Sequence, residues 1–347
     1  MKEKQIGYYF IVLASVVVVL AGIKNASSII VPFLLSVFIA IILAPTFTYL
    51  KSKKIPSSLA LIAVLGVFLL VVLFVVKLIS TSVYQFSVNV DDYTEKLVIY
   101  YEYIASFLQS FGYSISIESL SEMLNAKQIM KFVSSMVQGV GSLFTNGFVI
   151  ILTVAFMLLE SETFIRKVQV SSQDSLEHIE EIFHKIKHYM VIKSLISFAT
   201  AFVIYIALQL IGTDYPFLWA VLAFLLNFIP NIGSILAAVP AVLISLVQLG
   251  FMSASIVAGV YVLVNIVIGS IVEPKVMGKG LGVSTLVVFL SLIFWGWLLG
   301  IVGMFLSIPL TIMAKIIFNA NEKTKWLALM LGDGDNLQKK DPLIIKQ

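Results

Sequence analysis

Two short polar stretches interrupt the most apolar part of this 347-residue chain, and they carry the side chains that could bind a solute. The first is the run 227–234, NFIPNIGS, and the second extends from 265 to 285. Amides and hydroxyls suit a neutral, polyhydroxylated solute better than charged groups do. The candidate substrate-binding or pathway residues are Asn227, Pro230, Asn231, Gly233, Ser234, Asn265, Ser284 and Thr285.

The run 227–234 combines a proline and a glycine with amide and hydroxyl side chains. Proline lacks the backbone N–H and frees a carbonyl of the preceding turn, while glycine allows a close approach or a positive φ. Inside a membrane such a break is tolerated only where protein or a polar cavity surrounds it. Two interpretations stay open: a solute site, or a tight interhelical turn whose amides and hydroxyl satisfy only their own backbone.

The second stretch offers small residues followed by one carboxylate. The amide residue Asn265 is followed four and five positions later by the small residues Gly269 and Ser270. This spacing favours close packing of helices. Glu273 and Lys275 are candidates for ion coupling or gating, because a carboxylate at membrane depth can carry a proton. We favour a structural ion pair, in which Glu273 binds Lys275 or Lys279 at the membrane face.

Structural breaks are predicted at Pro240, Gly303 and Pro309. The segments 232–240 and 302–309 resemble each other, since each has a glycine near its start and a proline at its end. Two similar hairpins would suit a transporter built from repeats. A chance match of small residues among apolar ones explains the similarity equally well.

The composition places these stretches in a membrane protein. The chain is 60% hydrophobic and 12% charged, with a mean hydropathy of +1.03, whereas soluble domains carry about 25% charged residues. Lys and Arg lie at segment ends, so the basic pI predicts orientation and not nucleic-acid binding. There is no cysteine, and we interpret the stripe of Glu180, His184 and His188 as a solvated face. We therefore expect no metal, no cofactor and no enzyme activity.

Apolar stretches of about 20 residues predict membrane-spanning helices. We expect five of them at 7–23, 28–50, 57–79, 143–159 and 193–211. If every basic loop is cytoplasmic, 217–248 enters and returns, 255–272 crosses, and 284–318 again enters and returns. Both termini are then cytoplasmic. The predicted fold is thus an all-α polytopic membrane protein with about eight transmembrane segments, broken or re-entrant helical hairpins and an external helical region.

This pattern predicts five regions along the chain. They are transmembrane helices one to three at 1–80, an extracytoplasmic amphipathic helical region at 81–140, helices four and five at 141–216 with a cytoplasmic helix at 172–190, a hairpin-containing transport unit at 217–318, and a cytoplasmic tail at 319–347.

Three runs carry a resemblance to a known family. They are IIVPFLLSVFIAIILAP, LLNFIPNIGSILAAVPAVL and the segment that contains EPKVMGKGLGVSTLVVF. The chain resembles the autoinducer-2 exporter family along its whole length, most densely after Asn227, and is most similar to the quorum-signal exporter branch. The resemblance implies about eight transmembrane segments, export of small polar signalling molecules, a homo-pentamer and an elevator-like movement. Other members are described as sodium (lithium)/proton antiporters.

These observations predict a transporter in the bacterial inner membrane that exports a small polar signalling molecule, namely autoinducer-2. A monovalent cation/proton antiporter with Glu273 as the titrating group is the alternative. A scaffold or receptor that binds a partner through 81–140 is a third. The expected partners are the lipid bilayer, a small polar solute and further copies of the chain, with a pentamer as the suggested state.

Overall fold

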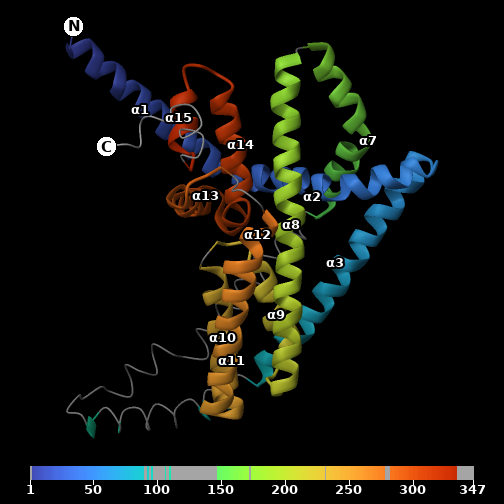
Figure 1. Ribbon diagram of the computed structural model, residues 1–347, viewed down its shortest axis with the longest axis vertical. Coiled ribbons are helices and arrows are strands. Elements are labelled where there is room, and N and C mark those ends of the chain that lie inside the picture. Colours follow the sequence, from blue (N-terminus) through green and yellow to red (C-terminus); the bar gives the residue numbers. More distant parts are fainter. Residues whose placement is uncertain are drawn as a thin grey trace. The chain divides into compact units, whose positions relative to one another are not determined.

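A computed structural model describes residues 2–89, 92–93, 95–96, 106, 109–110, 147–171, 173–230, 232–277 and 282–333. Every element assigned within these residues is a helix (Figure 1), which confirms the predicted all-α fold. The chain divides into two compact units. The first comprises 1–65, 145–192 and 279–347, and the second comprises 66–144 and 193–278.

Within the described residues, five helical stretches are long and apolar enough to cross a membrane: Ser27–Ser52, Ser57–Val88, Ile179–Ile211, Phe251–Met277 and Thr285–Phe305. Shorter apolar helices cover Ile11–Asn25, Gly147–Ser161, Pro216–Leu226, Gly233–Leu249 and Ser307–Asn319. Large apolar side chains such as Leu70 and Phe74 are more than half exposed. Such a surface is suited to lipid and not to water, so this is a polytopic membrane protein.

The first unit begins with α1 (Lys2–Asn25), α2 (Ser27–Ser52) and the start of α3 (Ser57–Val88). Helix α7 (Gly147–Ser171) packs against α2 around a core that includes Phe47, Val64 and Val154. Ser36 is fully buried between them, with its Oγ 3.3 Å from the carbonyl oxygen of Ile150.

The first unit ends with α13 (Thr285–Phe305), α14 (Ser307–Asn319) and α15 (Lys325–Met330). Helix α13 breaks at Gly300, where φ is 70° and ψ is −153°. The predicted break at Gly303 is therefore wrong: this glycine is helical, and a Cβ there would overlap the carbonyl oxygen of Trp295. Pro309 lies in the first turn of α14, directly after the junction with α13 at Leu306, where a missing N–H costs no helical bond.

The second unit contains the end of α3, the second half of α8 (Gln173–Ile211), and a hairpin of α9 (Pro216–Leu226) and α10 (Gly233–Leu249). Helix α11 (Phe251–Val264) packs along α10 and continues into the π-helix η1 (Asn265–Val272) and the short α12 (Glu273–Met277). Figure 1 shows α10 and α11 side by side. At 11 residues, α9 is about 17 Å long, which is too short for a hydrocarbon core of about 30 Å.

Two expectations about α10 and α8 need correction. Pro240 does not break α10, which runs through it with the proline buried; neighbouring helices let membrane helices tolerate a lost backbone bond. The cytoplasmic helix predicted at 172–190 and the span predicted at 193–211 form one 39-residue helix, α8. No proline or glycine separates them, and the helix ends only at Gly212, whose φ is +85°.

A polar cluster holds the start of α9. Tyr215 precedes Pro216 in a left-handed conformation with φ 56°, and its hydroxyl accepts a hydrogen bond from the Asn89 amide at 2.8 Å. The Tyr93 hydroxyl donates to Asp214 Oδ2 at 2.6 Å. Burial, the hydrogen bond to Asp214 and a further hydrogen bond of 3.3 Å to the Tyr215 hydroxyl raise the pKa of Tyr93 above its ordinary value. Most of the expected external region at 81–140 lies outside the described residues.

Candidate functional site

The turn between α9 and α10 is closed by a glycine. A Cβ on Gly233 would overlap the carbonyl oxygen of Leu226, so no other residue fits without moving the backbone. The Ile232 N–H donates to the Pro230 carbonyl at 2.7 Å within the turn. The Asn227 side chain bonds outside this turn. Its Nδ2 donates to Ser197 Oγ of α8 at 2.9 Å, which joins the turn to a neighbouring helix.

One stripe of α8 presents polar groups to the same region. Lys193, Ser197, Thr200 and Ile204 follow at intervals of four, three and four residues, so they share a helical face. All four are buried. A buried lysine and two buried hydroxyls along one face of an apolar helix require polar partners nearby.

The third wall is the π-helix. π-Helical turns are rare and occur often at functional sites. Here the turn places Asn265 over Gly269: a Cβ on that glycine would lie 2.9 Å from Asn265 Oδ1, so the missing side chain leaves room for the amide. Glu273 begins α12 directly after the π-helix.

A buried ion pair joins two of these walls. Lys193 Nζ lies 2.5 Å from Glu273 Oε1, and the two side chains are 4% and 19% exposed. The predicted ion pair of Glu273 with Lys275 is therefore wrong, because the carboxylate binds a lysine 80 residues earlier. Lys279 lies outside the described residues. A close pair at this depth is strongly favoured over an unpaired charge of either sign.

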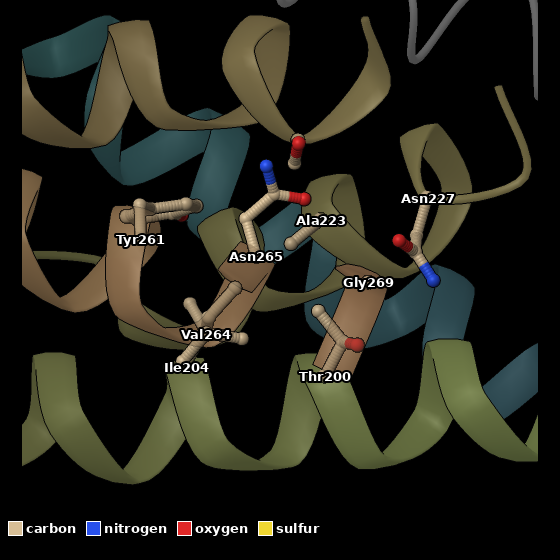
Figure 2. Close-up of a pocket in the computed structure, with 9 residues that line it drawn as sticks. Thr200, Ile204, Ala223, Asn227, Tyr261, Val264, Asn265 and Gly269 are labelled. Carbon is tan, nitrogen blue, oxygen red and sulfur yellow. The ribbon is translucent and has the colours of Figure 1, made fainter. Parts of the chain in front are cut away.

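The turn, the π-helix, Glu273 of α12 and Lys193 of α8 line a polar cavity of about 140 Å³. It is lined by Lys193, Asn227, Ile229, Pro230, Ser234, Asn265, Gly269, Ser270 and Glu273. A narrower space of about 10 Å³ shares four of these residues and adds Thr200, Ile204, Ala223, Tyr261 and Val264. Figure 2 shows Asn265 near the middle of this narrower space, with Tyr261 and Asn227 on either side and Thr200 on the α8 ribbon.

The structure thus brings together part of the predicted site. Asn227, Pro230, Ser234, Asn265 and Glu273 line one cavity, and Gly233 shapes the adjoining turn.

Other candidates lie elsewhere. Ser284 and Thr285 belong to the first unit, where Ser284 Oγ caps α13 by accepting from the Val287 N–H. Lys275 is exposed and does not line the cavity. Asn231 lies outside the described residues.

The sequence interpretation missed the α8 side of the cavity. Lys193 of α8 lines the cavity, and Thr200 of α8 lines the narrower space together with Tyr261 of α11, but none of the three was among the candidates. A detectable signal was present in α8, since a lysine is followed by hydroxyl residues four and seven positions later inside an apolar run. Within the described residues, no three His, Cys, Asp or Glu side chains gather as metal ligands. The cavity can therefore offer hydrogen bonds and one neutralised ion pair to a solute.

Known proteins resemble this chain over nearly its full length. A family model described as AI-2E family transporter matches residues 13–323. A "Putative transport protein" of Haemophilus influenzae is 39% identical over 94% of this chain and 96% of its own. The "AI-2 transport protein TqsA" of Escherichia coli K12 is 36% identical over 93% and 95%, and the "Putative transport protein YhhT" of that organism is 34% identical over 93% of both. The chain therefore belongs to the AI-2E family of membrane transporters.

Proposed function

We propose that the protein exports autoinducer-2, a small polar signalling molecule, across the bacterial inner membrane. The observation that carries this proposal is the polar cavity of about 140 Å³ inside a membrane-embedded unit. Its lining offers two amides and several hydroxyl and backbone groups, and its one carboxylate is neutralised by Lys193. Such a lining suits an uncharged, polyhydroxylated solute. The name of the similar E. coli protein, an AI-2 transport protein, supports the same cargo.

We assign the transport unit to the predicted region 217–318, extended to include α8 from Lys193. This extension is supported by the lining, since Lys193 of α8 lines the cavity and Thr200 and Ile204 line the narrower space beside it. Short and interrupted helices around a polar site near the middle of a membrane are typical of secondary transporters. The hairpin of α9 and α10, its glycine-closed turn and the π-helix all have this character.

The test is the distribution of autoinducer-2 in cells with and without the gene. We expect cells that lack it to retain more of the signal inside, and the wild-type gene to restore efflux. Asn265→Ala should restore less at an equal amount of protein in the membrane, because it removes an amide from the cavity wall. An unchanged distribution between cells and medium would refute the proposal.

A second candidate, exchange of sodium or lithium for protons, is favoured by one observation: the Glu273 carboxylate lies at the cavity wall. Proteoliposomes that contain the purified protein would show a sodium-dependent change of internal pH if it were correct. Wild-type rates in Glu273→Gln, at equal protein per vesicle, would reject the coupling role of this carboxylate.

We further propose that both termini are cytoplasmic, that the region 81–140 is external, and that the protein forms homo-oligomers, with a pentamer as the expected state. The basic loops and the resemblance support these points. The chain has no cysteine, so single substitutions such as Lys2→Cys and Ser114→Cys report sidedness without background. A membrane-impermeant thiol reagent should label only the second in intact spheroplasts.

A further inference from the structure

Two buried hydroxyl groups in the second unit have no partner among the described residues. They are Thr200 Oγ1 and the hydroxyl of Tyr261, whose residues are 6% and 3% exposed. Buried polar groups in native proteins are nearly always hydrogen-bonded, and an unsatisfied one needs an explanation. Both hydroxyls belong to residues that line the same narrow space of about 10 Å³.

The hydrogen bonding of Thr200 differs from that of three other helical threonines among the described residues. Thr48, Thr81 and Thr153 each donate to the carbonyl oxygen four residues earlier in their own helix. Thr200 could satisfy its hydroxyl in the same way on α8, but it does not. The oxygen is therefore left available to the space between α8, α11 and η1.

The narrow space adjoins the larger cavity, and we call the two spaces the inner end and the outer end of the site. The two share Asn227, Ser234, Asn265 and Gly269. The outer end holds the ion pair of Lys193 and Glu273, whereas the inner end has no charged side chain. The site is thus graded from the neutralised ion pair at its outer end to hydroxyls and amides at its inner end. Figure 2 shows the inner end, with Thr200, Tyr261 and Asn265 labelled.

The inner end can both donate and accept hydrogen bonds. Each free hydroxyl offers one donor and two lone pairs, and the Asn265 amide offers both functions. A hydroxyl or carbonyl group would satisfy them in either direction. A cation would find only neutral oxygens there, because the one nearby carboxylate is already paired with Lys193. The volume suits a single group of about the size of a water molecule.

We propose that Thr200 and Tyr261 form a specificity subsite that binds a hydroxyl or carbonyl group at the inner end of a small neutral solute. This inference rests on the proposed export of such a solute. It assigns a role to two residues that neither the motif at 227–234 nor the ion pair includes. The subsite selects solutes with a polar group at that end, since an apolar group would leave the two hydroxyls unsatisfied.

The test uses Thr200→Val and Tyr261→Phe, which keep nearly the same shape and remove one hydroxyl each. Autoinducer-2 transport is measured in proteoliposomes that contain the full-length protein. We expect the apparent KM to rise roughly two- to ten-fold in each variant, the factor that corresponds to one lost hydrogen bond. The thermal unfolding temperature should stay equal or rise, because each substitution removes a buried group that lacked a partner.

Thr153→Val and Tyr205→Phe are the matched controls. Thr153 lies on α7 in the first unit, and Tyr205 lies on α8 but lines neither space. Both should keep the wild-type KM. An unchanged KM in Thr200→Val and Tyr261→Phe overturns the proposal. The proposal is also overturned if either variant transports the solute as the wild type does but no longer depends on sodium, because the inner end would then hold a cation.

A second measurement separates this proposal from the proposed cargo. If wild-type protein moves no autoinducer-2, the proposed cargo is wrong, and the subsite is tested with a panel of neutral pentoses, tetroses and diols. A solute that raises the unfolding temperature of the wild-type protein and of Tyr205→Phe, but not of Thr200→Val or Tyr261→Phe, supports the subsite. If no member of the panel distinguishes these proteins, the subsite proposal is overturned.

Discussion

The ion pair of Lys193 and Glu273 makes a quantitative prediction about stability. The two charges are 2.5 Å apart, and the side chains are 4% and 19% exposed. Removal of one partner of a buried pair typically costs about 3–5 kcal/mol, because it leaves the other charge buried and uncompensated. Glu273→Gln strands the more deeply buried charge, so we expect a loss in that range. Lys193→Met strands the more exposed carboxylate and should cost less.

The double variant separates the ion pair from the cost of each substitution. Lys193→Met with Glu273→Gln leaves no buried charge at the cavity, so its free energy of unfolding should lie closer to that of the wild type than the sum of the single losses predicts. We expect a coupling energy of about 2–3 kcal/mol, near the upper end of what contacting residues show. The assay is reversible denaturant unfolding in detergent micelles, followed by tryptophan fluorescence.

An exposed ion pair on α8 provides the control. Lys185 and Glu181 are 2.7 Å apart, but their side chains are 47% and 42% exposed. An exposed i, i+4 pair is worth about 0.3–0.5 kcal/mol, so Lys185→Met and Glu181→Gln should show a correspondingly small coupling energy. The reasoning fails if the buried pair couples no more strongly than this exposed one, or if its two single losses are additive.

Two further predictions follow from the backbone and from the cluster at α9. Gly233→Ala should lower the free energy of unfolding by about 1–3 kcal/mol, because its Cβ overlaps the Leu226 carbonyl. In the control Gly66→Ala the new Cβ meets no atom within 4 Å, so this variant should not destabilise α3. Equal unfolding midpoints in the two variants would contradict this prediction. Burial first, and then the hydrogen bond to Asp214, raise the pKa of Tyr93. The neutral, hydrogen-bonded hydroxyl therefore stabilises the fold fully below about pH 10, the ordinary tyrosine pKa, and less as pH rises through the higher folded value. The stability difference between wild type and Tyr93→Phe should therefore be constant from about pH 6 to pH 9 and shrink above about pH 10, and a difference that grows with pH would argue against the hydrogen bond.

The sequence pattern predicted the helices and turns correctly where the chemistry of neighbouring residues determines them. The apolar stretch of α2 and the turn around Gly233 follow from hydropathy and from the conformations of glycine and proline. The pattern was less reliable where a single residue decides a helix end. Gly300 breaks α13 because its φ is positive, whereas Gly303 stays helical and is needed for a close backbone contact. Both roles call for glycine, so the residue type alone does not show which glycine breaks the helix.

The sequence also missed the exact partners of the polar residues. The spacing of Asn265, Gly269 and Ser270 suggested helix packing, whereas the structure has a π-helix with the Asn265 amide over Gly269. The partner of Glu273 was expected among its neighbours in the chain and is Lys193. Local spacing constrains which residues share a face, but it does not constrain which distant face packs against it.

The sequence by itself determined that this protein is helical and embedded in a membrane, because apolar length and charge placement act within single segments. It also determined that polar and backbone-breaking residues gather in 227–234 and in 265–285. Only the tertiary structure decided that α8 completes their cavity, that Lys193 neutralises Glu273, and that Thr200 and Tyr261 are left without partners. The physical reason is that a buried polar group is satisfied by whichever helix packs against it, and packing joins residues that the linear order keeps apart.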